Sequence, residues 1–427
     1  MKRLLRIAIF TLLLTSMSAL VFNIKSVEAA PEMIYVDDDN TTGPWNGTEE
    51  NPYQNITDAL EHASDNDTIY VCSGTYYEHV LVNKSVSIIG ENKTTTILDG
   101  GSQKYTIINV IKPCVTIAGF TIQNAADDPL AYGISVSKTE NVTIRNNMIT
   151  TGRYGILLHL SSHCRIRTND VSNSYYCGIG LQGTPSQGAR NSTFIGNSII
   201  DNRVGIWIAD EDCQYNIFYN NNIINNTDQL AYFGGPNSLD NGIEGNYWSN
   251  YNGTDTDNDG IGDTEVPHEG DNYPLMGMFS SFNTSVGKHI NVISNSTIES
   301  LQYFESNSTI KMYVSSMMSG QTYGFCRICI LYELINVTGI SVMIDDGEIA
   351  VLYPNYNLYD NGTHRWIYFA YEHSTREIDI IPEFPLTMIA PLFIAATTLA
   401  VMFLRKKRHG ICKSHLCQRI WRNRHLC

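Results

Sequence analysis

A repeat with a period of about two dozen residues runs through the middle of this 427-residue sequence. The dipeptide Gly-Ile recurs at intervals of 22, 23 and 27 residues, at Gly133-Ile134, Gly155-Ile156, Gly178-Ile179 and Gly205-Ile206. An asparagine two residues before an apolar residue recurs in step, at Asn146, Asn169, Asn197, Asn221 and Asn246. Units of this length with no helix cannot close a core alone and must stack on their neighbours.

The segments between these anchors are alternating strands of only three to five residues, such as Val142–Ile144 and Ile206–Ile208. When coils of such strands stack, similar side chains from successive coils pack on one another in the interior. Gly and Asn suit the bends between the strands because both tolerate positive φ. A sandwich or propeller would need hairpins of longer strands, and the leucine pattern of leucine-rich repeats is missing. The repeat therefore predicts an all-β fold, a right-handed parallel β-helix with asparagine ladders.

The same pattern sets the expected domains. We predict an N-terminal cap over residues 31–66, with a short helix in Pro52–Ala63, and a β-helix domain over residues 67–277. Its coils are expected to run to about residue 250, and an Asp-rich loop follows them. Longer alternating runs then predict a smaller β-sandwich over residues 278–381, and the turn Tyr359–Thr363 favours antiparallel strands there.

Both ends of the chain look like targeting segments. Residues 1–30 have the layout of a signal peptide, with an uncleaved anchor helix as the alternative. Residues 382–404 include twenty residues without a charge, the length of one transmembrane helix, and the basic segment 405–427 follows as a cytoplasmic tail. We expect an exported cell-surface protein held to the membrane by its C-terminal segment.

Charge is distributed unevenly along the chain. The net charge is −15, and residues 405–427 carry eight Lys or Arg and no acid, which leaves −23 for the other 404 residues. An acidic surface repels phosphate backbones, so nucleic acid is excluded as a partner.

Fifteen Asn-x-Ser/Thr sequons lie between the two targeting segments, as expected of a glycoprotein, although a chain this rich in Asn and Thr also produces sequons by chance. Their asparagines are Asn40, Asn46, Asn55, Asn66, Asn83, Asn92, Asn141, Asn191, Asn225, Asn252, Asn283, Asn295, Asn307, Asn336 and Asn361.

Ten cysteines are spread thinly along the chain, without the dense framework of a disulfide scaffold. The first five, Cys72, Cys114, Cys164, Cys177 and Cys213, fall in apolar strand patterns, so we expect them to pack as small hydrophobes.

One segment has the ligand pattern of a calcium loop. Oxygen ligands for Ca²⁺ would come from Asp255, Asp257, Asp259, the Ile261 carbonyl and Asp263, with Gly260 at the sharp turn. The twelfth position, a bidentate Glu in an EF-hand, is Val266 here. A structural Ca²⁺ and an empty Asp-rich turn both fit this pattern.

Catalysis on a polysaccharide would need two carboxylates, or an acid and a base, in one groove. The candidates in the bends are Asp127, Asp128, Asp210, Glu211 and Asp212, and the candidate bases are Arg165 and Arg167. Solvated acids in turns are the alternative interpretation.

Carbohydrate binding without catalysis would use exposed aromatic rings that stack on sugars. The sequence offers Tyr175, Tyr176, Tyr215, Tyr219 and Tyr232. An insertion at Gly183–Ala189 lengthens one coil and is the kind of loop in which binding function concentrates.

Several segments, in this order, resemble NosD-like β-helix proteins of the pectate-lyase superfamily. They are Pro52–Leu60, Asp67–Val71, Ser73–Tyr77, Val86–Gly90, Gly245–Ser249, Asp255–Asp263 and Asp271–Met276, so the resemblance covers about residues 33–277. It implies the β-helix fold and a superfamily often linked to carbohydrate binding, in which some members assist the maturation of copper centres.

The C-terminal segment resembles a second family of signals. Pro382-Glu-Phe-Pro385, the apolar span and Arg405–Arg408 are similar to a PEF-type sorting signal of archaeal proteins, which an archaeosortase reads. Such signals usually end near the basic cluster, whereas nineteen residues follow Arg408 here.

Copper would need soft ligands, and the nearest group is Met312, Met317, Met318, Cys326 and Cys329. The two cysteines lie three apart in a predicted strand and so face opposite sides. The sequence therefore leaves three hypotheses: a non-enzymatic surface protein that binds carbohydrate or envelope polymers, a polysaccharide lyase, epimerase or hydrolase, and a copper-delivery accessory.

Overall fold

The computed structural model describes residues 30–383 apart from residues 151, 233, 336–338, 345–350, 353–356 and 373–374. The predicted signal peptide, the C-terminal apolar segment, the basic tail and the sequon at Asn336 lie outside the described residues. Within the described part of the chain, no helix is long and apolar enough to cross a membrane.

Residue contacts divide the chain into two compact units. The first, which we call the coil unit, consists of Met1–Phe218 and Ile223–Ser238, and the second, the sandwich unit, of Tyr219–Asn222 and Leu239–Cys427.

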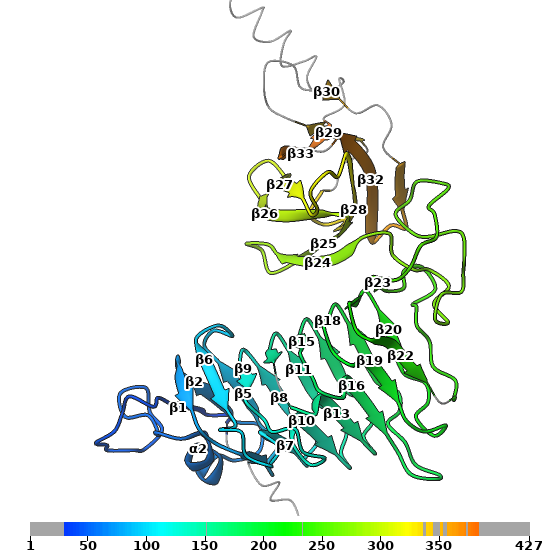
Figure 1. Ribbon diagram of the computed structural model, residues 1–427. Helices are drawn as coiled ribbons and strands as arrows, with labels where there is room; N and C mark the ends of the chain where they lie inside the picture. The colour runs from blue at the N-terminus through cyan, green and yellow to red at the C-terminus, as the bar shows by residue number, and fades with distance from the viewer. Residues whose placement is uncertain are drawn as a thin grey trace, which may run out of the picture. The chain divides into compact units, whose positions relative to one another are not determined.

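The coil unit is a right-handed parallel β-helix of about seven turns, as predicted (Figure 1). Each turn contributes one short strand to each of three parallel sheets. The first sheet runs in the order β1 (Met33–Val36), β2 (Thr68–Val71), β5 (Ser87–Gly90), β8 (Thr116–Ala118), β11 (Thr143–Arg145), β14 (Arg165–Arg167), β17 (Thr193–Ile195) and β20 (Ile217–Tyr219). The second contains β4 (Val80–Val82), β7 (Ile108–Val110), β10 (Tyr132–Ser137), β13 (Tyr154–His159), β16 (Cys177–Gln182), β19 (Val204–Ile208) and β22 (Asp228–Tyr232). The third contains β3 (Gly74–Tyr76), β6 (Thr96–Asp99), β9 (Thr121–Gln123), β12 (Met148–Thr150), β15 (Asp170–Ser172), β18 (Ser198–Ile200) and β21 (Asn222–Ile224).

Like side chains stack on like inside the coils. In the first sheet Ile144 pairs with Ile117 on one side and with Ile166 on the other, and all three are fully buried. Further along the same column, the rings of Phe194 and Phe218 stack with centroids 4.2 Å apart and planes 7° apart. These columns fill the interior of the helix and account for the apolar period of the sequence.

The repeated glycines of the Gly-Ile pairs are required by close approach of neighbouring coils. A Cβ atom on Gly155 would lie 2.7 Å from the carbonyl oxygen of Gly178, and one on Gly178 would lie 3.0 Å from that of Gly205. The bends instead place asparagines at positive φ, such as Asn141, with φ of 58°. The prediction that glycine serves the bends is therefore wrong for this column: glycine serves the contact between coils.

Asparagine ladders satisfy the backbone at the bends, as predicted. The Oδ1 atom of Asn169 accepts the backbone N–H of Asn147 at 3.1 Å and its side-chain N–H at 3.0 Å, and Asn169 donates to Asn197 in the same way. The ladder member is Asn147, not Asn146, which takes a φ of 54° in the bend before it. A second ladder joins Asn202 to Asn226.

The helix α2 (Ile56–His62) packs its apolar side on β1, β2 and β4, where the sequence predicts a capping helix. Its residues Ile56, Ala59 and Leu60 are buried. The strand β1 pairs in parallel with β2, so the first sheet already begins in the segment expected to be cap alone.

Residues 239–277 of the sandwich unit form a loop segment, which contains β23 (Tyr247–Trp248), and two antiparallel sheets follow this segment. One sheet has the order β24 (Met278–Asn283), β25 (His289–Ser294), β28 (Tyr323–Leu331), β32 (His364–Glu372) and β31 (Asn357–Asp360). The other has the order β26 (Ser296–Phe304), β27 (Thr309–Ser316), β33 (Arg376–Glu383), β29 (Gly339–Ile344) and β30 (Val351–Leu352). The turn between β31 and β32 joins antiparallel strands, as the sequence predicts.

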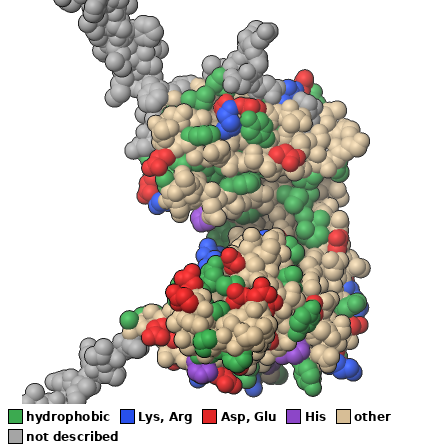
Figure 2. Space-filling view, turned by 90° about the vertical axis from the view of Figure 1, so that its left-hand side faces the viewer, with side chains coloured by type: hydrophobic (Ala, Val, Ile, Leu, Met, Phe, Trp, Pro, Cys, Tyr) green, Lys and Arg blue, Asp and Glu red, His purple; other side chains and the backbone are tan. Residues whose placement is uncertain are grey.

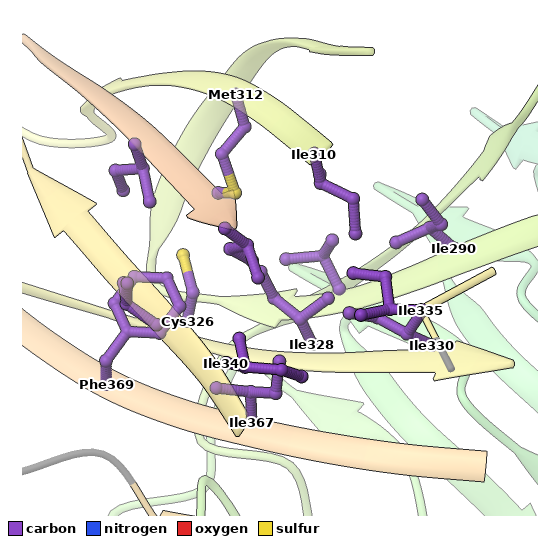
Figure 3. Close-up of a cluster of buried hydrophobic side chains, with 14 of the residues drawn as sticks. Ile290, Ile310, Met312, Cys326, Ile328, Ile330, Ile335, Ile340, Ile367 and Phe369 are labelled. Atoms are coloured by element: carbon purple, nitrogen blue, oxygen red, sulfur yellow. The ribbon is translucent and has the colours of Figure 1, made fainter. Parts of the chain in front are cut away.

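One apolar core joins these two sheets (Figure 3). Ile328 and Ile367 of the first sheet and Ile310 and Ile340 of the second are completely buried in it. Alternate residues of each strand enter the core, which leaves the other side chains of β28 and β32 on the outer face of the first sheet.

The seven described cysteines are free thiols. Cys164, Cys177 and Cys213 are buried, as expected of small hydrophobes, and Cys72 is half-buried. The expectation is wrong for Cys114, which is exposed and occupies a bend with φ of 58°.

We predict that Asn169→Ala lowers the free energy of unfolding by about 2–4 kcal/mol, because it leaves buried donors of Asn147 without their acceptor. Urea unfolding followed by circular dichroism measures this loss. Arg165→Ala, at an exposed position of β14, is the control and should change stability by less than about 0.5 kcal/mol. Equal stability of the two variants would contradict a stabilising ladder.

Candidate functional site

Four aromatic rings lie in contact on the outer side of the second sheet of the coil unit. Tyr154 contacts Tyr132 and Tyr176, with centroids 5.2 Å apart in both cases, and Trp207 lies 5.8 Å from Tyr154 and 5.3 Å from Tyr176. All four side chains are half-buried. We call this group the aromatic platform.

The stacking of coils brings these rings together. Tyr132 and Tyr154 begin the neighbouring strands β10 and β13 and pair in register. Trp207 on β19 lies opposite Gly180 on β16. A Cβ atom on Gly180 would lie 3.5 Å from atoms of both the Trp207 and the Tyr154 ring, so a larger residue there would crowd the platform.

Two arginines lie over the platform. The guanidinium carbons of Arg153 and Arg203 are 5.2 Å and 5.6 Å from the centroid of the Tyr176 ring. Burial raises the pKa of Tyr154 to about 12, so this phenol stays neutral at physiological pH. The platform therefore combines neutral aromatic faces with cationic hydrogen-bond donors.

Polar side chains follow the platform across the same strands. Ser137, His159 and Gln182 pair in register at the ends of β10, β13 and β16. Burial and the neighbouring Lys138 lower the pKa of His159, so its imidazole is neutral. Within the described residues, its Nδ1 atom is buried and has no hydrogen-bond partner.

Flat apolar rings beside hydrogen-bonding groups suit a ligand that has both kinds of surface, as a sugar ring does with its C–H face and its hydroxyl edge. Of the aromatic residues expected to bind sugars, Tyr176 belongs to the platform. Tyr175, Tyr215 and Tyr232 are exposed outside it, and Tyr219 belongs to the sandwich unit.

Tyr132, Tyr154 and Trp207 are not among the predicted sugar-binding residues, although the sequence holds a signal for the two tyrosines. Tyr132, Tyr154 and Tyr176 are spaced by 22 residues, which is the interval between the first two Gly-Ile pairs.

The candidate catalytic acids hold turns in place. Asp127 lies 3.9 Å from a guanidinium nitrogen of Arg153, and Asp128 lies 3.6 Å from the ammonium of Lys104 and accepts the backbone N–H of Leu130.

Asp210 and Asp212 tie down the insertion between β16 and β17. Asp210 accepts the backbone N–H of Gly183 at 2.7 Å, and Asp212 accepts that of Ser186 at 2.6 Å and pairs with Arg190 at 2.8 Å. The adjacent Glu211 accepts a hydrogen bond from Gln214 through its backbone carbonyl.

Arg165 and Arg167 both project from the outer side of β14, where Arg167 pairs in register with Arg145 of β11. Burial and then the charges of Arg145 and Arg165 lower the pKa of Arg167. Among the described residues, none of these three arginines forms an ion pair, so they form a cationic group apart from the candidate acids.

In the Asp-rich loop, carboxylate oxygens of Asp255, Asp257 and Asp263 lie within 4.8 Å of one another. Burial raises the pKa of Asp255, whereas hydrogen bonds from Thr256 lower that of Asp263. Hard carboxylate oxygens at this separation fit a Ca²⁺ ion better than a soft metal.

The structure places the two other residues of the predicted loop differently. The carboxylate of Asp259 lies 3.2 Å from the guanidinium of Arg327, which also donates to the Asp259 carbonyl oxygen at 2.7 Å. Ile261 forms an isolated bridge with Leu275.

Asp271 ends the asparagine ladder of the sandwich unit. Asn221 donates to Asn246, and Asn246 and the indole of Trp248 donate to the Asp271 carboxylate at 2.7 Å and 2.9 Å. A carboxylate accepts hydrogen bonds without leaving an amide donor unsatisfied, which suits the last position of a ladder. Burial raises the pKa of Asp271 to about 6.

The candidate soft-metal ligands are separated by the sheet. Met312 and Cys326 are completely buried in the sandwich core (Figure 3). Cys329, three residues further along β28, is only half-buried and lies outside that core. Met318 is exposed beyond the end of β27.

Residues 54–253 match the model of a protein family described as periplasmic copper-binding protein (NosD). The match lies on the coils and agrees with the parallel β-helix. No curated protein sequence matches the chain.

Solved structures similar to the chain include pectin methylesterase PemA from Erwinia chrysanthemi, with 15% identity over 62% of this chain and 86% of that one and a TM-score of 0.31. Another is the A-module of the mannuronan C-5 epimerase AlgE6 from Azotobacter vinelandii, with 13% identity over 50% and 75% of the two chains and a TM-score of 0.28. Superpositions this poor carry no argument about activity.

The raised pKa of Asp271 predicts a specific pH dependence. Its folded-state pKa of about 6 exceeds the ordinary value of 3.8, so the folded state binds this proton more tightly than the unfolded state does. The resulting contribution to the free energy of unfolding is present below pH 4 and is lost as pH rises through 6. The Asp271→Asn variant does not titrate at this position. Relative to it, the free energy of unfolding of the unsubstituted protein should fall by on the order of 3 kcal/mol between pH 3.5 and 7. Urea unfolding of both proteins across this range measures the difference. If the free energy of unfolding changed with pH in the same way for both proteins, the raised pKa of Asp271 would be contradicted.

Proposed function

We propose that the chain is an exported, non-enzymatic cell-surface protein whose aromatic platform binds a carbohydrate polymer. The observation that carries this proposal is the contact of four rings from successive coils, flanked by Arg153, Arg203 and a row of polar side chains.

The platform suits a chain of sugars better than a single sugar. It is built from residues of four successive coils, and because Tyr132 lies 5.2 Å from Tyr154, which lies 5.8 Å from Trp207, the ring centroids extend over at most about 11 Å. Because the strands belong to a stacked helix, the rings hold their spacing without ordering on binding, which favours affinity.

The candidate acids favour binding over catalysis. The carboxylates of Asp127, Asp128, Asp210 and Asp212 are each engaged by a basic side chain or a backbone N–H group that holds a turn. A lyase, epimerase or hydrolase is the alternative function. Asp210 and His159 would be the first residues to test, because the charge of Asp210 acts to raise the pKa of His159.

Copper delivery is the second alternative. The matched family is described as copper-binding, which supports this function. The soft side chains of the sandwich unit do not converge, since Met312 and Cys326 are buried in its core and Cys329 lies outside that core.

Export and anchoring rest on the sequence and on the matched family, which is described as periplasmic. We propose that the signal peptide is cleaved after Ala30 and that the C-terminal apolar segment spans the membrane or is processed by an archaeosortase. The described sequon asparagines are exposed except Asn40 and Asn295, whose side-chain amides donate to Pro52 and Tyr323 carbonyl oxygens, so glycans fit the other positions better.

A neutral or cationic polymer suits the surface as a whole. Figure 2 shows one face of the protein, on which acidic side chains (red) form clusters and basic ones (blue) are scattered. Long-range repulsion would weaken the binding of a polyanionic polymer, although the arginines at the platform would still favour the binding of single acidic groups.

We also propose that Ca²⁺ binds to Asp255, Asp257 and Asp263 as a structural ion, because three carboxylates this close repel one another without a cation. The ion would fix the loop that connects β23 to the two sheets.

We predict that Trp207→Ala weakens binding of the ectodomain to its polymer by roughly 5- to 30-fold, because a stacked ring contributes about 1–2 kcal/mol. A glycan array identifies the polymer, and titration with it measures the effect. Tyr175→Ala removes an exposed ring outside the platform and should leave affinity unchanged.

A reducing-sugar assay on the same polymers separates the alternatives. The proposal expects that no reducing sugar is released. If sugar is released, and if Asp210→Asn or His159→Ala abolishes this release, the protein is an enzyme instead. Equal affinity of the Trp207→Ala and Tyr175→Ala variants would reject the platform as the site.

For the calcium site, we predict that Ca²⁺ at about 100 times its Kd stabilises the chain by about 2.7 kcal/mol. Thermal unfolding with Ca²⁺ and with EGTA measures the shift in Tm. Asp257→Asn should abolish it, whereas Asp228→Asn, at an exposed acid of the coil unit, should not. Identical Tm values with and without Ca²⁺ would contradict the calcium site and show that the loop is an Asp-rich turn without a bound ion.

A further inference from the structure

Three arginines lie together on the outer face of the first sheet of the coil unit. Arg145 on β11 pairs in register with Arg167 on β14, and Arg165 precedes Arg167 by two residues on the same strand. The residues between them, Ile144 and Ile166, are fully buried, so the alternation of a strand directs all three arginine side chains outward. We call this group the arginine patch.

The three arginines are close enough to act on one another. Neighbouring strands lie about 4.8 Å apart and diagonal neighbours about 7–8 Å apart, so the side chains start from points within these distances. Burial and then the charges of Arg145 and Arg165 lower the pKa of Arg167. Like charges at this separation repel one another, and a bound anion would remove this repulsion.

The patch has no acidic partner. Among the described residues, no carboxylate lies within ion-pair distance of the three arginines. The acids nearest to them in sequence have other partners: Glu140 lies 3.9 Å from a ring nitrogen of His163, and Asp170 pairs with Lys93 at 2.6 Å. The net charge of the whole chain is −15, so the patch is a local reversal of the overall sign.

Hydroxyl groups and an apolar side chain lie beside the cations. Thr143 and Thr193 pair in register with Arg165 on its two sides, and Ile195 pairs with Arg167. All three neighbours are half-buried. Threonine hydroxyls donate hydrogen bonds to an anion, and the apolar side chain excludes water, which strengthens the attraction between a guanidinium and an anion.

We infer that the arginine patch binds a tetrahedral oxyanion, which is a sulfate or a phosphate group. Each guanidinium is a planar fork that donates two parallel hydrogen bonds to the oxygens of one anion. Three such forks need more acceptor oxygens than the two of a carboxylate, and a sulfate or phosphate group supplies them. A sulfate ester and a phosphate monoester share this chemistry, and the experiment distinguishes these two sources.

The arrangement suits a ligand that carries few such groups. A nucleic acid repeats a negative charge along its whole backbone, so the acidic surface of the protein repels it, whereas a single oxyanion meets only the patch. The patch lies on the first sheet and the platform on the second, so the inference does not rest on the proposed function.

The test is titration of the purified protein with sodium sulfate, sodium phosphate and sodium acetate, at an ionic strength that sodium chloride keeps constant. NMR spectra of the arginine Nε–H groups measure binding. We expect saturable binding of sulfate, of phosphate or of both, and binding of acetate that is weaker by at least about threefold. Tighter binding of sulfate identifies a sulfate ester as the source of the group, and tighter binding of phosphate identifies a phosphate monoester.

Matched variants assign the binding to the patch. Arg165→Ala and Arg167→Ala should each weaken the binding of the oxyanion by roughly 5- to 20-fold, because each removes a charge-assisted pair of hydrogen bonds. Arg167→Lys keeps the charge and loses the fork, so it should weaken binding by a smaller factor, roughly 2- to 5-fold. Lys104→Ala removes the same charge from a side chain that is 80% exposed and lies outside the patch, and should have no effect.

Three results would overturn the inference: no saturable binding of either oxyanion, equal binding of acetate and sulfate, or full binding by both Arg165→Ala and Arg167→Ala. Loss of binding in Arg153→Ala, with full binding by the patch variants, would place the oxyanion at the platform and would also overturn it. Arg167→Ala should leave polymer binding to the platform unchanged, so failure of this inference and failure of the proposed function are distinguishable.

Discussion

The hydrogen bond between stacked asparagine side chains is the interaction on which the coil unit depends. A bend of the chain leaves backbone N–H groups unpaired inside the protein, and a buried donor without a partner costs about 1–3 kcal/mol. Asn169 and Asn197 solve this at successive bends, since each accepts two hydrogen bonds from the asparagine one turn before it, Asn147 and Asn169 respectively. Because the ladder needs one asparagine per turn at one place, it fixes the register of the coils that Asn147, Asn169 and Asn197 join, and hence the positions of the outward side chains on those coils.

Register connects the ladder to both candidate sites. The platform exists because residues at the same place in successive coils are neighbours in space, so Tyr132 meets Tyr154 although 22 residues separate them. In the sandwich unit, Asp271 closes a ladder with a carboxylate, in the same loop segment as the three acids of the candidate calcium site. In the coil unit, the same pairing of stacked strands that buries the core thus arranges the rings of the platform on the surface without any dedicated loop.

The sequence predicts the parts of the fold that repeat and misses the parts that do not. Period and strand length are enough for the β-helix, and helical spacing of Ile56, Ala59 and Leu60 is enough for the capping helix. The choice between Asn146 and Asn147 depends on which residue enters the bend, and that is decided by backbone conformation. One cavity of the sandwich unit is lined by Asp257 and also by Tyr359 and Trp366, about a hundred residues later, so no local spacing could reveal it. Asp259 fits a calcium motif, yet Arg327 engages its carboxylate.

The spacing of Tyr132, Tyr154 and Tyr176 has a consequence for how such a surface can change. Each tyrosine is carried by one complete unit of 22 residues, and a unit stacks on its neighbours through the same ladder and the same glycine contact wherever it is inserted. Duplication of one unit would therefore lengthen the row by one ring without disturbing the others. The length of such a surface therefore changes in whole steps of one repeat.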